Sequence, residues 1–261
     1  MSVQAEARPS ATICLLRDGL SGVEVLMGKR GSTAKFMADA WVFPGGRVDE
    51  TDRDRAADLV GGDNDPDQLP WIATALRETV EELGIWLTDP PRAEALEDRD
   101  VFATLDAGGQ SFEANVSYFA NWVTPADMPI RYDARFYATV VDSELQPIPD
   151  KAEIERAEWV RPADAILAAA RREWLIPFPT HVTLESLAKV STAQEFIDRA
   201  SQLDIDTIQP RIRLEDDGSL RVVMPGEPGF DELPEATGDL QRLAQAARKT
   251  KGTRHTIAEL E

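Results

Sequence analysis

The sequence of 261 residues contains one cysteine, two histidines and comparatively few basic residues. The single cysteine, Cys14, cannot form a disulfide within the chain, which is typical of proteins from a reducing compartment. It lies in the apolar run 11–16, where a buried and inert thiol is expected rather than a nucleophile. The histidines, His181 and His255, have no further metal-ligating residues at useful spacing, so we expect neither to bind a metal.

Positive charge and long apolar runs are also scarce. The chain has 28 basic and 47 acidic residues, which gives a formal net charge of −19. This balance argues against partners such as nucleic acid or anionic membranes, because both require basic surface. No run approaches the roughly 18 apolar residues of a membrane span, and together with the lone cysteine this predicts a cytoplasmic protein. The negative net charge does not exclude small phosphorylated ligands, because a few local cations or a bound metal can reverse the electrostatic field at a binding site.

The hydrophobic fraction of 43% is ordinary for a globular protein. Short β-rich segments followed by few helices predict an α+β fold in which helices flank a mixed sheet. The expected strands are 11–17, 23–30, 113–123, 135–141 and 156–160, with a later hairpin formed by 208–214 and 219–224. The expected helices are 69–83, 161–174, 182–190, 192–203 and 237–249.

The expected helix 69–83 carries three carboxylates on one face. At about 100° per residue, Glu78, Glu81 and Glu82 lie together with Arg77 at their edge, and the opposite face is apolar. Like charges three and four residues apart repel, and anions in the last turn of a helix oppose its dipole. A divalent cation bound by oxygen ligands would offset both effects. The alternative is a solvated charged face, and this stretch alone does not separate the two interpretations.

Two segments together resemble a known family signature. They are Trp41-Val42-Phe43-Pro44-Gly45-Gly46 and Arg77-Glu78-Thr79-Val80-Glu81-Glu82-Leu83-Gly84-Ile85. The second is similar to the end of the Nudix box, which reads glycine, five residues, glutamate, seven residues, then Arg-Glu-U-x-Glu-Glu-x-Gly-U, where U is hydrophobic. Gly46 matches the opening glycine. Asp52 stands where the family has glutamate, with Glu50 as a competing candidate, and 24 residues (53–76) rather than seven precede Arg77.

The insertion, with the segments 131–137 and 179–187, is similar to one branch of the family, which contains the mammalian peroxisomal coenzyme A diphosphatase and its bacterial relatives. This resemblance implies a Nudix-type α/β/α sandwich with a mixed sheet. We expect a core at 8–176, an insertion at about 53–69, and a C-terminal helical and hairpin extension at 177–261 packed on the core. The segment 54–69 is expected to be a surface loop with a short helical turn near 55–60, and it could serve as a lid, an interface element or a tolerated insertion.

The resemblance also implies the site. It makes Glu78, Glu81 and Glu82 the ligands of Mg²⁺ or Mn²⁺, and assigns catalysis to Glu81 and Glu82 with Arg77 orienting a carboxylate. Glu153, five residues before Glu158 of the motif Glu158-Trp159, is the candidate for a further ligand or base, with Asp150 and Glu155 as rivals. Gly45 and Gly46 would bring the turn beside the phosphates. Arg30 and Lys35 would bind them, unless these cations are only a solvated hairpin end.

The function that this resemblance implies is hydrolysis of a diphosphate bond in a nucleoside diphosphate derivative, with coenzyme A or acyl-coenzyme A as first candidates. ADP-ribose and dinucleotides are the alternative substrates. A ligand-binding sensor with the same fold is the alternative from another class. The expected partner is therefore a small-molecule diphosphate, and the oligomeric state is left open, with a homodimer as one option.

Overall fold

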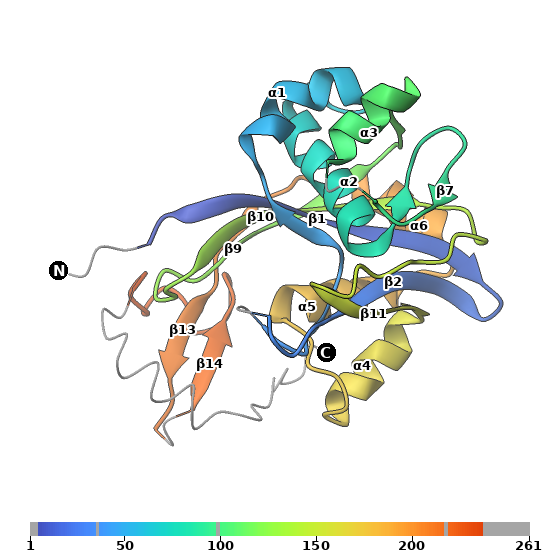
Figure 1. Cartoon of the computed structure of the whole chain (residues 1–261). Coiled ribbons are helices and arrows are strands. Elements are labelled where there is room, and N and C mark those ends of the chain that lie inside the picture. The colour runs from blue at the N-terminus through green and yellow to red at the C-terminus, as the bar shows by residue number, and fades with distance from the viewer. Residues whose placement is uncertain (1–4, 35–36, 98–99, 217–218, 237–261) are drawn as a thin grey trace. The chain divides into compact units, whose positions relative to one another are not determined.

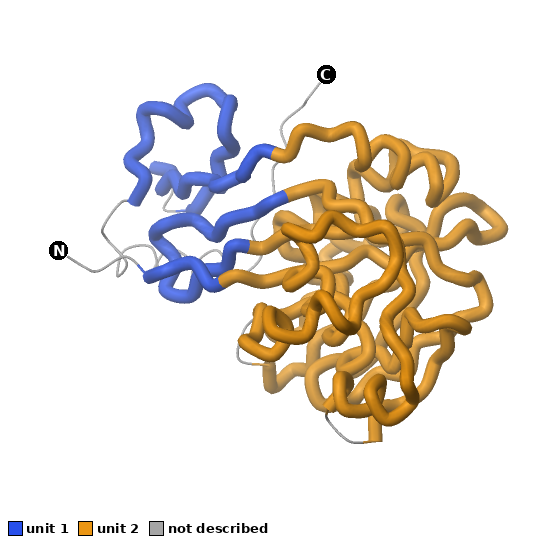
Figure 2. The backbone as a smooth tube through the Cα atoms, turned by 90° about the horizontal axis from the view of Figure 1, so that it is seen from above, with its two compact units in different colours: residues 1–8, 121–133, 206–261 blue, residues 9–120, 134–205 orange. Residues whose placement is uncertain are grey.

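The computed structural model describes residues 5–34, 37–97, 100–216 and 219–236. By its internal contacts the chain divides into two compact units (Figure 2). Unit 1 contains residues 1–8, 121–133 and 206–261, and unit 2 contains residues 9–120 and 134–205. This division differs from the domains expected from the sequence, because 177–205 fall in unit 2. The boundary at 177 stays a prediction.

The main sheet is mixed and has eight strands, in the order β11-β2-β1-β10-β9-β12, with β3 paired to β2 and β4 paired to β1. The pairs β1/β2 and β2/β11 are antiparallel, whereas β9 and β12 are parallel. Its strands are β1 (Ala7–Gly19), β2 (Gly22–Arg30), β3 (Trp41–Val42), β4 (Gly45–Arg47), β9 (Ser117–Val123), β10 (Arg131–Val140), β11 (Ile154–Val160) and β12 (Thr207–Ile208).

Helices cover both faces of the sheet in unit 2, with α1, α2 and α3 on one side and α4 and α5 on the other (Figure 1). The helices are α1 (Glu50–Leu59), α2 (Leu69–Leu83), α3 (Val101–Gly108), α4 (Pro162–Ala170), α5 (Phe178–Leu187) and α6 (Ala193–Ala200), and a 3₁₀ turn, η1, spans Pro66–Gln68. The expected α+β class and α/β/α arrangement are therefore confirmed. None of the described helices is long and apolar enough to cross a membrane.

Three two-stranded ladders complete the fold. They are β5 (Val60–Gly61) with β8 (Phe112–Glu113), β6 (Ile85–Trp86) with β7 (Arg92–Ala93), and β13 (Arg211–Leu214) with β14 (Leu220–Val223). The last is the C-terminal hairpin expected from the sequence. The helix expected at 237–249 lies outside the described residues.

The amphipathic pattern of α2 places its apolar face in the core. Leu76 and Val80 belong to one buried cluster with Ile13 and Leu15 of β1. The predicted span 69–83 is confirmed. The 3₁₀ turn η1 leads directly into it, and Gln68 occupies the position before the first helical residue. The carboxylate face of α2 lies next to β4, where the N–H of Gly45 donates to Glu82.

The segment after the opening glycine was wrongly expected to be mostly loop. Residues Glu50–Leu59 form helix α1, because Ala56 and Leu59 are buried in the core cluster. Asp52, in the first turn, accepts the backbone N–H of Asp49, the residue before the helix, at 2.9 Å. Such a bond satisfies one of the donors that a helix start leaves unpaired.

Gly84 ends α2 in the left-handed conformation, with φ of 63°. Its N–H donates to the carbonyl of Val80 at 2.8 Å. A Cβ at this position would lie 2.9 Å from the carbonyl oxygen of Glu94. Glycine is thus required here for its conformation and for the close approach of another backbone segment.

We predict that Gly84→Ala destabilises the protein more than Gly109→Ala. Gly109 also ends a helix with φ of 59°, but a Cβ there meets nothing within 4 Å. The left-handed conformation costs each alanine about 1–2 kcal/mol, and only Gly84→Ala adds a steric clash. Urea unfolding of both variants measures the difference, and equal losses would show that contact with the Glu94 carbonyl is unimportant.

Candidate functional site

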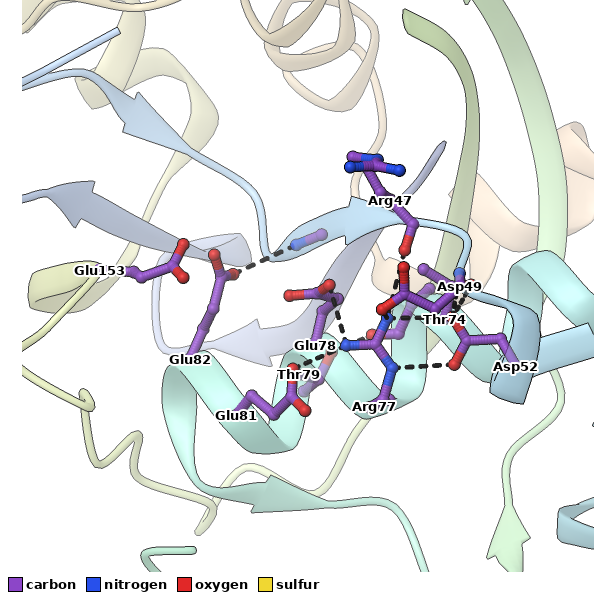
Figure 3. A network of polar contacts seen from close by, with 12 residues as sticks. Arg47, Asp49, Asp52, Thr74, Arg77, Glu78, Thr79, Glu81, Glu82 and Glu153 are labelled. Carbon is purple, nitrogen blue, oxygen red and sulfur yellow. Dashed lines mark hydrogen bonds and ion pairs between the residues drawn. The ribbon is translucent and has the colours of Figure 1, made fainter. Parts of the chain in front are cut away.

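Arg77 is the centre of a buried polar network on α2 (Figure 3). Its Nε and Nη2 donate to the two carboxylate oxygens of Asp52 at 2.8 and 3.0 Å. Asp52 is fully buried, and Glu50 is exposed. Thr74 Oγ1 lies 2.8 Å from the same carboxylate. Of the two acids left open by the sequence, the structure pairs Asp52 with the arginine of the box.

The remaining nitrogen atom of Arg77, Nη1, orients two glutamates. Nη1 donates to Glu78 Oε1 at 3.0 Å and to Glu81 Oε2 at 2.7 Å, and Nη2 donates to the carbonyl of Arg47 at 3.2 Å. Burial lowers the pKa of Arg77, but its bonds to Asp52 and the surrounding negative charges raise the pKa overall. The guanidinium is therefore a permanent cation that holds these carboxylates in place.

Glu78 and Glu82 are the least compensated charges of this face. Burial raises the pKa of Glu78 to about 7, against the opposing charge of Arg77. Burial and then the charge of Glu78 hold the pKa of Glu82 well above its ordinary value, although Glu82 accepts the N–H of Gly45 at 3.2 Å. Burial also raises the pKa of Glu81, while its ion pair with Arg77 lowers it. The buried Glu82 and the partly exposed Glu78 thus lack a full countercharge.

Glu153 joins these acids from the loop before β11. Its carboxylate points toward that of Glu82 (Figure 3), and its charge raises the pKa of both Glu78 and Glu82. The pairing of β11 with β2 places Ile154 opposite Arg30, and Arg30 Nη2 lies 4.0 Å from Glu153 Oε2. Arg30 also has a buried Nε without a hydrogen-bond partner.

The two rivals of Glu153 have other partners. The Asp150 carboxylate accepts the backbone N–H groups of Glu153 and Ile154. The carboxylate of Glu155 lies 3.6 Å from Lys29 Nζ. The sequence offered no clear means of separating the three, because it does not show which side chain a loop turns inward.

The glycine pair lets the turn approach the acids. A Cβ on Gly46 would clash with the Glu78 carboxylate. The N–H of Gly45 donates to Glu82. The structure therefore brings together six residues predicted from the sequence: Gly45, Gly46, Arg77, Glu78, Glu81 and Glu82. Arg30 and Glu153, which the sequence also predicts, lie at their border. Lys35 lies outside the described residues.

The donor set fits a hard divalent cation. Glu78, Glu82 and Glu153 offer only oxygen atoms and carry excess negative charge, which suits Mg²⁺ and Mn²⁺. Within the described part of the chain, no three acidic, histidine or cysteine side chains already converge closely enough to hold an ion. Glu81 is the least available of the predicted ligands, because it is paired with Arg77 at 2.7 Å.

A family model for the NUDIX domain matches residues 7–179. The chain belongs to the Nudix hydrolase family. A putative nudix hydrolase 7 of Caenorhabditis elegans is 33% identical over 179 residues, which cover 64% of this chain and 56% of that protein. This Nudix chain therefore matches little more than half the length of that relative.

Two further relatives of this Nudix hydrolase support the match. An acyl-coenzyme A diphosphatase of Xenopus laevis is 22% identical over an alignment of 291 residues, covering 87% of this chain and 76% of that protein. The crystal structure of a NUDIX hydrolase from Alicyclobacillus acidocaldarius superimposes with a TM-score of 0.67 at 26% identity, covering 77% of this chain and 99% of that one. The Nudix fold and the resemblance to the coenzyme A branch are confirmed.

A cavity of about 760 Å³ lies elsewhere in unit 2. Its lining includes Thr88, Asn115, Thr139 and Gln194, and none of the carboxylates around Arg77. We therefore place the site on chemistry and burial rather than on cavity size.

We predict that Asp52→Asn lowers the free energy of unfolding by about 3–5 kcal/mol, because it removes the fully buried charge that binds two nitrogen atoms of the Arg77 guanidinium. Asp106→Asn is a matched control, since Asp106 also pairs with an arginine, Arg55 of α1, at 2.8 Å but is half exposed. Its loss should stay within about 1 kcal/mol. Urea unfolding compares the two, and similar losses would contradict the central role of Asp52.

We further predict that Glu78→Gln makes the metal-free protein more stable at pH 7.5. The folded-state pKa of Glu78, about 7, exceeds the unfolded value of roughly 4.3, so the folded state binds more protons between these values. Its contribution to stability therefore falls as pH rises through this window.

Thermal unfolding in chelator at pH 5 and pH 7.5 tests this point. The stabilisation by Glu78→Gln should grow with pH. Glu94→Gln, which alters an exposed carboxylate paired with Arg92, should show no such growth. A Glu78→Gln variant that is less stable than wild type at pH 7.5 would contradict the assignment.

Proposed function

We propose that this Nudix hydrolase cleaves the diphosphate bond of a nucleoside diphosphate derivative, with coenzyme A or acyl-coenzyme A as the first candidates. The observation that carries the proposal is the pair formed by the buried Glu82 and the partly exposed Glu78, which lacks a full countercharge and lies beside the Gly45-Gly46 turn. A divalent cation would supply positive charge to this face, and the diphosphate that it binds would lie beside the turn.

Hydrolysis transfers the oxygen of water to one phosphorus atom and breaks its bond to the bridging oxygen, which leaves two phosphate monoesters. Bound Mg²⁺ or Mn²⁺ would relieve the repulsion between the anionic diphosphate and the incoming oxygen. Glu78 and Glu82 would hold the cation, with Glu81 as a further ligand once it turns from Arg77. Arg77 would keep the carboxylate of Glu78 oriented throughout.

Glu153 would accept the proton of the attacking water, since its carboxylate is exposed to solvent and faces Glu82. Arg30 would bind a phosphate oxygen through its unpaired Nε and its Nη2 group. Lys35 remains a proposed phosphate ligand from the sequence alone. A cytoplasmic location and the use of a small-molecule substrate belong to the same proposal.

The choice of coenzyme A rests on the resemblance to the acyl-coenzyme A diphosphatase of Xenopus laevis. Cleavage of coenzyme A would yield 4′-phosphopantetheine and adenosine 3′,5′-bisphosphate. ADP-ribose and dinucleotides contain the same diphosphate group and are the alternative substrates. A sensor that binds without hydrolysis is the alternative function, but it has no need for a cluster of buried acids.

We predict that coenzyme A or an acyl-coenzyme A is cleaved fastest in a panel that also contains ADP-ribose, NADH and dinucleoside polyphosphates, with Mg²⁺ or Mn²⁺. Mass spectrometry of the products identifies the bond broken. Glu82→Gln should lower kcat by at least about 100-fold, since loss of groups around a metal costs 10–100-fold even when they do not ligate it. Glu94→Gln is the control and should retain activity.

Preferred cleavage of ADP-ribose would redirect the substrate assignment without affecting the site. Full activity of Glu82→Gln would contradict the site. Binding without cleavage of any compound would favour the sensor.

A further inference from the structure

The loop between β10 and β11 is tied to the last turn of α2. The final carbonyl groups of a helix have no partner within it. Here the N–H of Ile148 donates to the carbonyl of Leu83 at 2.7 Å, and the N–H of Asp150 donates to the carbonyl of Glu82 at 3.1 Å. The backbone of Asp150 is therefore fixed to the residue that carries one of the buried carboxylates.

The side chain of Asp150 holds the other end of this loop. Its Oδ1 accepts the N–H of Glu153 at 3.1 Å and that of Ile154 at 2.9 Å. The intervening Lys151 adopts a left-handed conformation with φ of 64°. The carbonyl of Glu153 in turn accepts the N–H of Gly31 at 2.9 Å. Both the N–H and the carbonyl of Glu153 are thus hydrogen bonded.

We propose that Asp150 is a positioning residue that sets Glu153 at a defined place relative to Glu82. The path is short: the Glu82 carbonyl binds the Asp150 N–H, and the Asp150 carboxylate binds the Glu153 N–H. Asp150 does not itself reach the reacting atoms, because its carboxylate is used on the backbone. This inference rests on the role proposed above for Glu153.

A double-mutant cycle tests the proposal, with kcat and KM measured for Asp150→Ala, Glu153→Gln and the double variant on the compound that wild type cleaves fastest. Asp150→Ala should lower kcat by about 10–100-fold, the usual cost of losing an orienting partner, with little change in KM. In the Glu153→Gln background the same substitution should cost less than about threefold, because the group that it positions is already gone.

Two further variants separate positioning from general stability. Asp150→Asn keeps an oxygen at Oδ1, which accepts both N–H groups, so it should retain most of the wild-type kcat. Asp142→Ala removes a comparable turn contact in the same loop, where Asp142 accepts the N–H of Glu144 at 2.8 Å. It should leave kcat unchanged.

Wild-type kcat in Asp150→Ala, or losses that multiply in the double variant, would overturn the proposal while leaving the role of Glu153 intact. Wild-type kcat in Glu153→Gln would overturn both. A crystal structure of Asp150→Ala gives a readout that needs no substrate. We expect the Glu153 carboxylate to turn away from Glu82, and an unchanged position would overturn the proposal.

Discussion

The site depends on the buried ion pair between Arg77 and Asp52. A guanidinium that donates to both oxygens of one carboxylate has a fixed plane, so its remaining nitrogen atom, Nη1, points at Glu78 and Glu81. Asp52 belongs to the first turn of α1, and Arg77 belongs to α2. The pair therefore joins the helix that leads into the insertion to the helix that carries the acids.

The fold concentrates negative charge where stability alone would avoid it. The apolar face of α2 must pack on the sheet, which forces Glu78 and Glu82 under the Gly45-Gly46 turn. Burial there raises the pKa of both carboxyl groups. Two arginines, Arg77 and Arg30, cannot neutralise three glutamates and the neighbouring Asp52 and Glu153. This imbalance is the physical reason to expect a divalent cation rather than a purely structural network.

Much of this arrangement could be predicted from the sequence. The limits of α2 follow from its apolar spacing and from Gly84, and the box residues locate the acids. Helix α1 could not be predicted, because its residues are strongly acidic and only Ala56 and Leu59 reveal an inner face. Which of Asp52 and Glu50 binds Arg77 depends on how α1 packs against α2, because this packing decides which acid faces Arg77. The place of Glu153 depends on loop hydrogen bonds made by Asp150, which no local pattern specifies.

The central claim is that the carboxylate face of α2 binds a divalent cation. Anomalous diffraction from crystals soaked in Mn²⁺ tests it most directly, because the ion is located without reference to any substrate. The account predicts an anomalous peak within ligand distance of the carboxylates of Glu78 and Glu82, absent from crystals of Glu82→Gln. A wild-type map with no peak at these carboxylates would contradict it.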